Sequence, residues 1–293
     1  MKSAVVLMAY GSPERLADVP AYYADIRGGR PVAPEHLADL VERYRRLGIE
    51  DSSPLNAITE QTRAGLEAEL GMPVFTGMKH WTPHIADAAE AAVSSGAEQI
   101  VGVVLAPHYS ALSIAGYREQ LERALAGYGE LRFVESWHDE PGFVELLADR
   151  VRGTDAHVVF TAHSLPARIL EAGDPYRDQL LETSRLVAEA AGLSAWSFSF
   201  QSEPPTGEPW LGPDILDHLE ALGQQGVERV LVCPVGFVSD HLEIRWDLDV
   251  EAQEKAAELG LQLERIEMPN SDPQFIGTLG LIVRRALSVP SPA

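Results

Sequence analysis

Short apolar runs alternate along the whole chain with segments of helical periodicity, and this alternation is the feature that most restricts the fold. Strands that are separated by helices need crossover connections, which produce parallel sheets. The pattern therefore predicts an α/β protein. The predicted strands are residues 4–9, 74–77, 100–106, 131–134, 157–162, 196–200, 229–235 and 261–266.

The segments between these strands have apolar residues at helical spacing, and several begin with Pro or an acidic residue, as helices do. The predicted helices are residues 34–47, 58–70, 84–95, 141–152, 177–191, 214–225 and 273–287. The strands fall into two sets of four. We therefore expect two domains, residues 1–145 and 146–293, each with a four-stranded parallel sheet flanked by helices.

The two halves of the chain have a similar beginning. Residues 5–13 and residues 158–166 each consist of an apolar strand, an Ala and a polar ring residue, with Pro three positions later, so Tyr10 and His163 are counterparts. Open parallel sheets bind ligands at the carboxyl ends of their strands. Two such halves facing each other would place both residues at one cleft.

Composition excludes several classes of protein. The net charge of −21 disfavours attraction to nucleic acids and to anionic membranes. No apolar run approaches the roughly 18 to 20 residues that span a bilayer, so a soluble protein is expected. Cys233 is the only cysteine, which excludes an intramolecular disulfide and an iron–sulfur cluster held by four cysteines, and favours a reducing cytoplasm.

Charge is unevenly distributed along the chain. Residues 1–80 contain 9 Lys or Arg and 11 Asp or Glu, whereas residues 81–293 contain 14 and 33. An anionic ligand should therefore find its partners in the first segment, and a cation should be attracted to the second. Arg27 and Arg30 lie beside glycines in the first segment, an arrangement that suits a carboxylate clamp. A surface turn with solvated arginines explains the same residues.

His163 directly follows a predicted buried strand, so its imidazole lies at the carboxyl end of that strand. A general base or a metal ligand would occupy this place. The alternative is a His that only forms a hydrogen bond with a neighbouring loop. Ser164 is adjacent, but no Gly-x-Ser-x-Gly motif surrounds it, which argues against a serine hydrolase.

Residues 234–251 carry the densest set of chemically active side chains. If this segment turns helical near His241, three carboxylates stack on one face. They are Glu243, Asp247 and Glu251, at i, i+4 and i+8. Like charges at this spacing repel, so a row of oxygen ligands suits a hard cation that is passed along rather than caged. A solvated acidic face is the alternative.

Two further strand ends mix aromatic side chains with hydrogen-bond donors. Lys79, His80 and Trp81 follow one strand, and His108 and Tyr109 follow another. Such a surface suits a large planar ligand with acidic substituents, although loop aromatics also serve packing. The chain has no P-loop, no Gly-x-Gly-x-x-Gly after the first strand and no His-Glu-x-x-His, which argues against nucleotide and zincin chemistry.

Ten motifs, in order along nearly the whole chain, resemble those of the ferrochelatase family, and in particular its water-soluble coproporphyrin III ferrochelatases. They are residues 7–13, 25–30, 52–55, 77–80, 106–110, 162–166, 173–176, 200–202, 209–214 and 234–243. The resemblance implies the chelatase-like fold, with two Rossmann-like domains around a porphyrin cleft and the last helix packed back on the first domain.

The resemblance also implies a reaction, the insertion of Fe²⁺ into a porphyrin with release of two protons. Fe²⁺ is then a substrate, and no prosthetic group is expected. His163 and Glu243 would accept protons and guide the metal, and Tyr10 would approach from the opposite face. Asp247 and Glu251 would continue the metal-binding line. The propionates and the ring would be held by Tyr10, Arg27, Ser53, Lys79, His80, Tyr109 and Trp210.

Departures from the family pattern refine these expectations. Gly28 stands where some relatives have a second basic residue, so the propionate contacts are expected to differ. Residues 14–36 lack the apolar lip of membrane-associated relatives, which favours coproporphyrin III, with four carboxylates, over protoporphyrin IX. A monomer is expected, because the extension that dimeric relatives use is missing. The product, coproheme, would pass to a downstream enzyme of the heme pathway.

Two other classes of protein remain open. A cobalt or nickel chelatase for another tetrapyrrole is one, although its shorter relatives tend to concentrate histidines at the metal site. A non-catalytic tetrapyrrole carrier is the other. A carrier would tolerate the loss of His163 and Glu243, so the presence of both argues against it.

Overall fold

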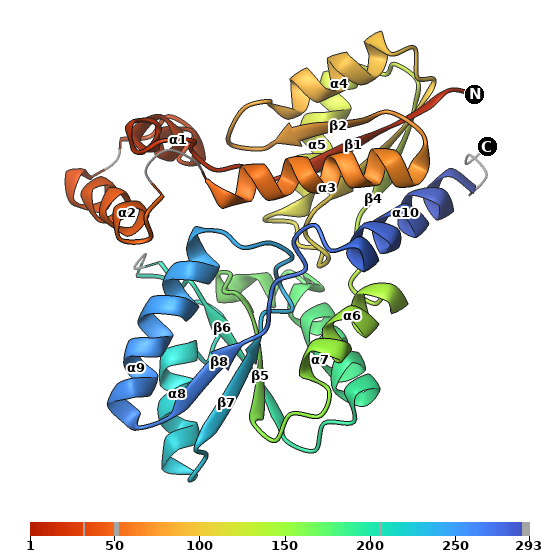
Figure 1. Ribbon diagram of the computed structural model, residues 1–293. Helices are drawn as coiled ribbons and strands as arrows, with labels where there is room; N and C mark the ends of the chain where they lie inside the picture. Colours follow the sequence, from red (N-terminus) through yellow and green to blue (C-terminus); the bar gives the residue numbers. More distant parts are fainter. Residues whose placement is uncertain (32, 50–52, 205–206, 289–293) are drawn as a thin grey trace.

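Within the residues that the structure describes, eight parallel strands form two four-stranded sheets, which confirms the predicted fold class (Figure 1). The computed structural model describes residues 1–31, 33–49, 53–204 and 207–288, so Ser52 of the motif at residues 52–55 lies outside them. The strands are β1 (Ser3–Ala9), β2 (Val74–Met78), β3 (Gln99–Val104), β4 (Glu130–Val134), β5 (His157–His163), β6 (Trp196–Gln201), β7 (Arg229–Cys233) and β8 (Gln262–Arg265).

The two sheets have the same strand order, β2-β1-β3-β4 and β6-β5-β7-β8. In each sheet the first strand of the half lies between the second and the third. Tyr10 directly follows β1 and His163 is the last residue of β5. The two counterparts predicted from the sequence repeat therefore occupy equivalent places, at the carboxyl ends of central strands.

The helices are α1 (Val19–Ile26), α2 (Pro34–Arg46), α3 (Pro54–Leu70), α4 (Ile85–Ser94), α5 (Ile114–Leu125), α6 (Pro141–Val151), α7 (Tyr176–Ala191), α8 (Ile215–Gln224), α9 (Ala252–Leu259) and α10 (Pro273–Ser288). The sequence prediction missed α1, α5 and α9. With eight residues each, α1 and α9 carry little periodic signal. In contrast, α5 buries Ile114, Tyr117, Leu121 and Leu125 at helical spacing, so its pattern was present.

Both faces of each sheet are buried, as expected for parallel sheets covered by helices. Val5 and Leu7 of β1 point to one hydrophobic core, and Val6 between them points to another. The first of these cores also contains Phe160 of β5 and Phe275 of α10. The two sheets therefore share one continuous core and are joined by apolar packing.

Helix α10 packs against both α3 and α6 (Figure 1). The Arg284 guanidinium donates hydrogen bonds to the backbone carbonyl of Glu69 at 2.7 Å and to its carboxylate at 2.9 Å, which ties α10 to α3. The predicted division between residues 145 and 146 falls within α6, and it stays a prediction.

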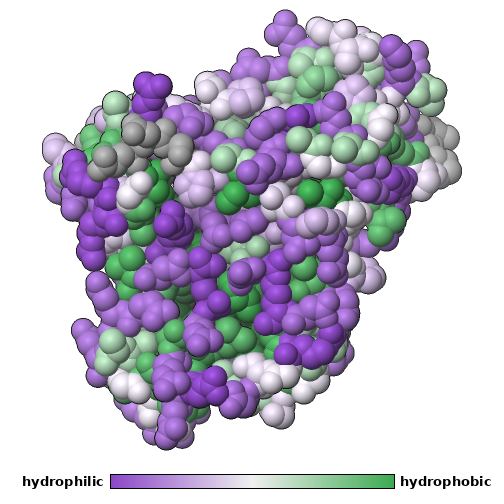
Figure 2. All heavy atoms as spheres, viewed as in Figure 1, coloured by the Kyte–Doolittle hydropathy of each residue, from purple (hydrophilic) through white to green (hydrophobic). Residues whose placement is uncertain are grey.

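The face of the molecule in Figure 2 is largely hydrophilic. This agrees with the composition, because 44 acidic and 23 basic side chains belong mostly on a protein surface. In the described part of the chain, no helix has the length and apolar character needed to cross a membrane.

Candidate active site

A cleft of about 560 Å³ lies at the carboxyl ends of strands from both sheets. Its volume is in the range of ligand-binding pockets. The cleft brings together chemically active residues from four strand ends. They are Tyr10 after β1, Lys79 and His80 after β2, His163 at the end of β5, and Glu243 after β7. All five belong to the predicted site.

Two glycines allow close backbone packing in the cleft wall. Gly11 has φ 89°, and a Cβ there would lie 2.8 Å from the Cβ of Trp81. A Cβ on Gly236 would lie 2.4 Å from the Cβ of Ala162, the residue before His163. The segment that leads to Glu243 therefore lies directly against the strand end that carries His163.

His163 and Glu243 face each other in the cleft. His163 Nε2 lies 3.5 Å from Glu243 Oε1, and their side chains are 32% and 40% exposed. On the other side of the carboxylate, His241 Nε2 lies 3.6 Å from Glu243 Oε2. One carboxylate between two imidazoles, open to a ligand, is suited to exchange protons and to bind a cation weakly.

His241 was not predicted as a site residue, because the sequence places it only at the start of a helix. Its position two residues before Glu243, in the segment richest in reactive groups, was the available signal. Its Nδ1 lies 2.9 Å from the Ser239 carbonyl oxygen. This contact directs the other ring nitrogen, Nε2, toward Glu243.

The orientation of His163 is set by its own strand end. Its Nδ1 forms a hydrogen bond with the Ser164 carbonyl, and the Tyr176 hydroxyl donates to the His163 carbonyl at 3.0 Å. Nε2 is thereby turned toward Glu243. Ser164 is buried and donates its hydroxyl to the Leu211 carbonyl at 2.7 Å, so this serine has a structural role.

The His163–Glu243 pair holds a proton on the imidazole at neutral pH. Confinement in the cleft lowers the pKa of His163, but the Glu243 carboxylate and the bond to the Ser164 carbonyl outweigh this and raise the pKa to about 9. Confinement likewise raises the pKa of Glu243, but the charges and hydrogen bonds of His163 and His241 bring it below its usual range. The unprotonated base of the pair is therefore Glu243.

The N-terminal side of the cleft combines aromatic rings with charged groups. The Tyr10 ring lies 4.7 Å from the His80 ring, between centroids, and His80 Nδ1 lies 2.8 Å from Asp25 Oδ2. The Lys79 ammonium lies 4.8 Å from the Tyr117 ring centroid. Burial lowers the pKa of Lys79. This side thus offers flat surfaces with a cation among them, as a planar anionic ligand requires.

Four helical tyrosines that line the cleft were not predicted as site residues, because a Tyr in a helix is equally typical of packing. They are Tyr22 of α1, Tyr44 of α2, Tyr117 of α5 and Tyr176 of α7. Burial raises the pKa of Tyr44 to about 12, and its hydroxyl lies 3.2 Å from that of Ser12. The Tyr44 hydroxyl therefore stays neutral at physiological pH.

Four residues that were predicted to contact the substrate are not among those that line the cleft. They are Arg27, Ser53, Tyr109 and Trp210. Arg27 directly follows Ile26, which does line it, and the Arg27 Nε atom is buried without a hydrogen-bond partner in the described residues. Ser53 is 3% exposed and directly precedes α3. Tyr109 packs beside the core between the first sheet, α4 and α5, and Trp210 pairs with the β5–α7 loop. Their roles stay predictions.

The acidic segment is helical, as predicted, but residues Ile244–Glu251 form a π-helix, η3, rather than an α-helix. The type of helix differs from an α-helix, but residues four apart also lie near one another on a π-helix, and the charges of both Glu243 and Glu251 act on Asp247. A π-helix has i→i+5 hydrogen bonds and is rare in proteins. Where it occurs, it is often at a functional site. Asp247 is 6% exposed, and burial, followed by the charge of Glu243, raises its pKa to about 7.

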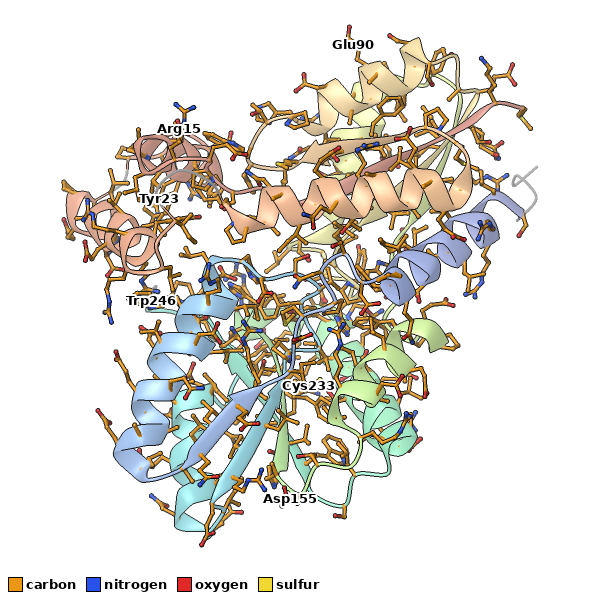
Figure 3. The ribbon with its side chains drawn as sticks, viewed as in Figure 1. Arg15, Tyr23, Glu90, Asp155, Cys233 and Trp246 are labelled. Atoms are coloured by element: carbon orange, nitrogen blue, oxygen red, sulfur yellow. The ribbon has the colours of Figure 1, made fainter. Side chains whose placement is uncertain are left out.

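Helix η3 contacts the N-terminal half of the chain through Trp246 (Figure 3). The guanidinium carbons of Arg43 and Arg46, both on α2, lie 5.1 Å and 4.8 Å from the centroid of the Trp246 ring. Trp246 is 7% exposed. The segment that carries the acidic residues is therefore packed directly against α2. The periodicity of the sequence does not predict such a contact between distant side chains.

Within the described ranges, no group of three or more His, Cys, Asp or Glu side chains is arranged to hold a metal ion. His163 and Glu243 alone would leave most coordination positions of a cation open. A cation bound there would be exchangeable.

The fold and the cleft define an α/β protein with two four-stranded parallel sheets and a chelatase-like fold. Among solved structures, SirB from Bacillus subtilis with Fe³⁺ has a TM-score of 0.64 at 14% identity, covering 98% of this chain and 96% of that one. The sirohydrochlorin chelatase SirB from Bacillus subtilis subspecies spizizenii, in complex with cobalt, has a TM-score of 0.60 at 15% identity, covering 98% and 95%. At these identities the likeness shows the fold.

The sequence comparisons identify the family. The family model described as Ferrochelatase matches residues 2–287. A ferrochelatase of Deinococcus radiodurans is 45% identical, covering 96% of this chain and 95% of the relative. The coproporphyrin III ferrochelatase of Bacillus subtilis is 40% identical, with 98% of both covered. The chain belongs to the ferrochelatase family, and it is a lyase that inserts Fe²⁺ into a porphyrin.

Proposed function

We propose that the porphyrin substrate is coproporphyrin III and the product coproheme. The observation that carries this proposal is the polar edge of the cleft at α1. Tyr22 and Ile26 of α1 line the cleft, and the chain continues into Arg27 and Arg30 without an apolar lip. Coproporphyrin III has four carboxylates and protoporphyrin IX has two, so cations at this edge favour the former.

The test of this proposal is anaerobic Fe²⁺ insertion into the two porphyrins by the purified protein. We expect kcat/KM for coproporphyrin III to exceed that for protoporphyrin IX by at least tenfold, about 1.4 kcal/mol of transition-state stabilisation. An equal or reversed preference would contradict the assignment of the substrate while leaving the enzyme a ferrochelatase. Co²⁺ and Ni²⁺ in the same assay test the alternative metals.

In the proposed reaction, Glu243 acts first, because it is the unprotonated base of the pair. As a carboxylate it attracts Fe²⁺, and the approaching cation compensates the charge that holds the proton on His163, so the imidazolium releases that proton to solvent. As Fe²⁺ then moves to the macrocycle, the neutral imidazole accepts one pyrrole proton and the Glu243 carboxylate accepts the other. Tyr10, from the N-terminal side, is proposed to contact the opposite face of the macrocycle. Porphyrin distortion in the cleft would expose the nitrogen lone pairs to the metal.

The carboxylates Asp247 and Glu251 are proposed to conduct Fe²⁺ toward Glu243. The double variant Asp247→Asn, Glu251→Gln should raise the KM for Fe²⁺ and leave coproporphyrin binding unchanged. The stability of the variant does not distinguish a metal path from a solvated acidic face. Asp247 is a buried carboxyl with a pKa of about 7, so its replacement by Asn removes a destabilising charge above that pH whether or not a path exists. The Fe²⁺ KM decides.

The matched control for this variant removes two acids from the exposed surface of the same half, Asp217→Asn with Glu258→Gln. It makes the same change in net charge and should leave the Fe²⁺ KM unchanged. If both double variants raise the KM equally, the general field of the acidic half attracts iron and no path exists. If neither changes it, iron arrives by another route.

Arg27 and Lys79 are proposed to hold propionates. Replacing either by Ala should raise the KM for coproporphyrin more than it lowers kcat, because these contacts exist in the ground and transition states alike. Each contact contributes about 1.5 to 3 kcal/mol if it excludes water. Lys2→Ala, at the opposite end of β1, is the control. An unchanged KM in both variants would argue against these contacts.

Ser53, His80, Tyr109 and Trp210 are proposed as further contacts to the macrocycle and its substituents. His80 lines the cleft, and Ser53 lies two residues before Leu55, which also lines it. Transfer of coproheme to a downstream enzyme, a cytoplasmic location and a monomeric state stay predictions from the sequence.

A further inference from the structure

We propose that Thr161 and Gln201 are positioning residues for Asp247, and that they hold its carboxylate so that one oxygen is left free for a cation. The proposal rests on the metal path proposed above and names the residues that set it. It concerns a short series of buried polar groups that runs from β5 through β6 to η3.

The series consists of two side-chain hydrogen bonds. The Thr161 hydroxyl donates to Gln201 Oε1 at 2.9 Å, and Gln201 Nε2 donates to Asp247 Oδ2 at 3.3 Å. Thr161 and Gln201 are both 0% exposed. They lie on adjacent strands, because β5 and β6 pair in parallel register. The contact with Asp247 therefore comes from Gln201, the last residue of the edge strand β6, and Thr161 of the central strand β5 supports it.

The Thr161 hydroxyl determines which end of the Gln201 amide meets Asp247. An amide has a donor end and an acceptor end, and with Oε1 taken by Thr161 only Nε2 is available to the carboxylate. A reversed amide would place Oε1 against a carboxylate oxygen, and the two acceptors would repel. Without the hydroxyl, Oε1 would be a buried acceptor without a partner, which is costly.

Ser202 supplies a second donor to the same oxygen atom. It has φ 64°, a left-handed conformation that is unusual for Ser, and its hydroxyl donates to Asp247 Oδ2. Both hydrogen bonds from described residues end on Oδ2, and none of the described residues donates to Oδ1. The carboxylate is thus fixed through one oxygen, and the lone pairs of the other are free. Unusual backbone conformations of this kind are found at functional sites.

Gln201 also connects Asp247 with His163. The two residues Gln201 and His163 are register partners, and the Ser164 backbone N–H donates to the Gln201 carbonyl at 2.8 Å. One residue therefore fixes the strand end that carries the imidazole and, through its side chain, the carboxylate on η3. A polar series buried for stability alone would not need to end on a carboxylate, since apolar residues of similar size pack at least as well.

The test is a double-mutant cycle on Thr161 and Asp247, with the KM for Fe²⁺ and the kcat for coproporphyrin metallation as readouts. Thr161→Val keeps the shape of the side chain and removes the hydroxyl. We expect it to raise the KM for Fe²⁺ by about three- to tenfold, with kcat and the KM for coproporphyrin unchanged. Thr161→Ser, which restores the hydroxyl, should return the Fe²⁺ KM to the wild-type value.

The matched control is Ser199→Ala. Ser199 is the register partner of Thr161, is equally buried, and has a hydroxyl without a hydrogen-bond partner in the described part of the chain. It should leave all kinetic constants unchanged. In the Asp247→Asn background, Thr161→Val should have no further effect on the Fe²⁺ KM.

The outcomes distinguish this proposal from the path itself. If Asp247→Asn raises the Fe²⁺ KM and Thr161→Val does not, the positioning role is overturned and the path stands. If Thr161→Val raises the Fe²⁺ KM equally in the wild-type and the Asp247→Asn backgrounds, the hydroxyl does not act through Asp247 and the proposal fails. If Asp247→Asn alone leaves the Fe²⁺ KM unchanged, the path itself is contradicted, and the positioning role fails with it.

Discussion

Replacement of His163 by Ala is expected to lower kcat for iron insertion by roughly 10²- to 10⁴-fold, the usual contribution of a positioned acid–base group. The physical reason is its place at the end of β5, with Nε2 3.5 Å from Glu243, in a cleft that is open to a macrocycle. Porphyrin binding should persist, because His163 is one of many groups that line the cleft. Fluorescence titration with coproporphyrin III measures binding separately from turnover.

The control for this variant is His157→Ala. His157 lies at the opposite end of the same strand, where its Nε2 lies 2.8 Å from the Ser197 hydroxyl oxygen. It should metallate porphyrin at the wild-type rate. Turnover of His163→Ala within a few-fold of wild type would remove the imidazole from the mechanism and leave Glu243 as the essential base.

Glu243→Gln is expected to reduce kcat by roughly 100-fold or more and to raise the KM for Fe²⁺, because it keeps the shape of the side chain and removes the unprotonated base of the site. The charge change also affects His163, which loses the partner that raises its pKa. Glu264→Gln, on the exposed face of β8, is the control for loss of one acid. Wild-type kinetics in Glu243→Gln would contradict the proposed role.

The same variant has a distinct signature in the pH dependence of unfolding. The pKa of His163 in the folded state, about 9, exceeds its ordinary value of 6.5. The His163–Glu243 interaction therefore stabilises the folded state fully below about pH 6.5, and this contribution is lost as the pH rises through 9. The stability difference between wild type and Glu243→Gln should be larger at pH 6 than at pH 9.5. Denaturant titrations at both pH values measure it.

The fold followed from the sequence because strands buried on both faces read as continuous apolar runs. Each predicted strand overlaps an observed one, and the shared order of the two sheets agrees with the repeat around Tyr10 and His163. Helices α1 and α9 were missed because eight residues carry little periodicity. Local patterns thus sufficed for the architecture and failed for its two shortest α-helices, whereas α5 was missed although its apolar spacing was present.

The site was predictable to the extent that its residues lie at strand ends. Lys79, His80 and His163 each end or follow a strand, and topology brings them to one cleft. The contact of His241 with Glu243 depends on the exact turn before η3, which periodicity does not describe. The π-helical geometry around Asp247 was not predictable, because the spacing of apolar and charged residues there does not distinguish a π-helix from an α-helix.

The contact of Trp246 with α2 has a mechanical consequence for the mouth of the cleft. Tyr44 of α2 lines the cleft, and Arg43 and Arg46 of the same helix hold the indole ring that belongs to η3. A movement of α2 that widens the entrance for a macrocycle must either break the contact between these guanidiniums and the indole or move η3 as well. The width of the porphyrin entrance and the position of the acidic helix are therefore coupled, and one changes without the other only if this contact is broken.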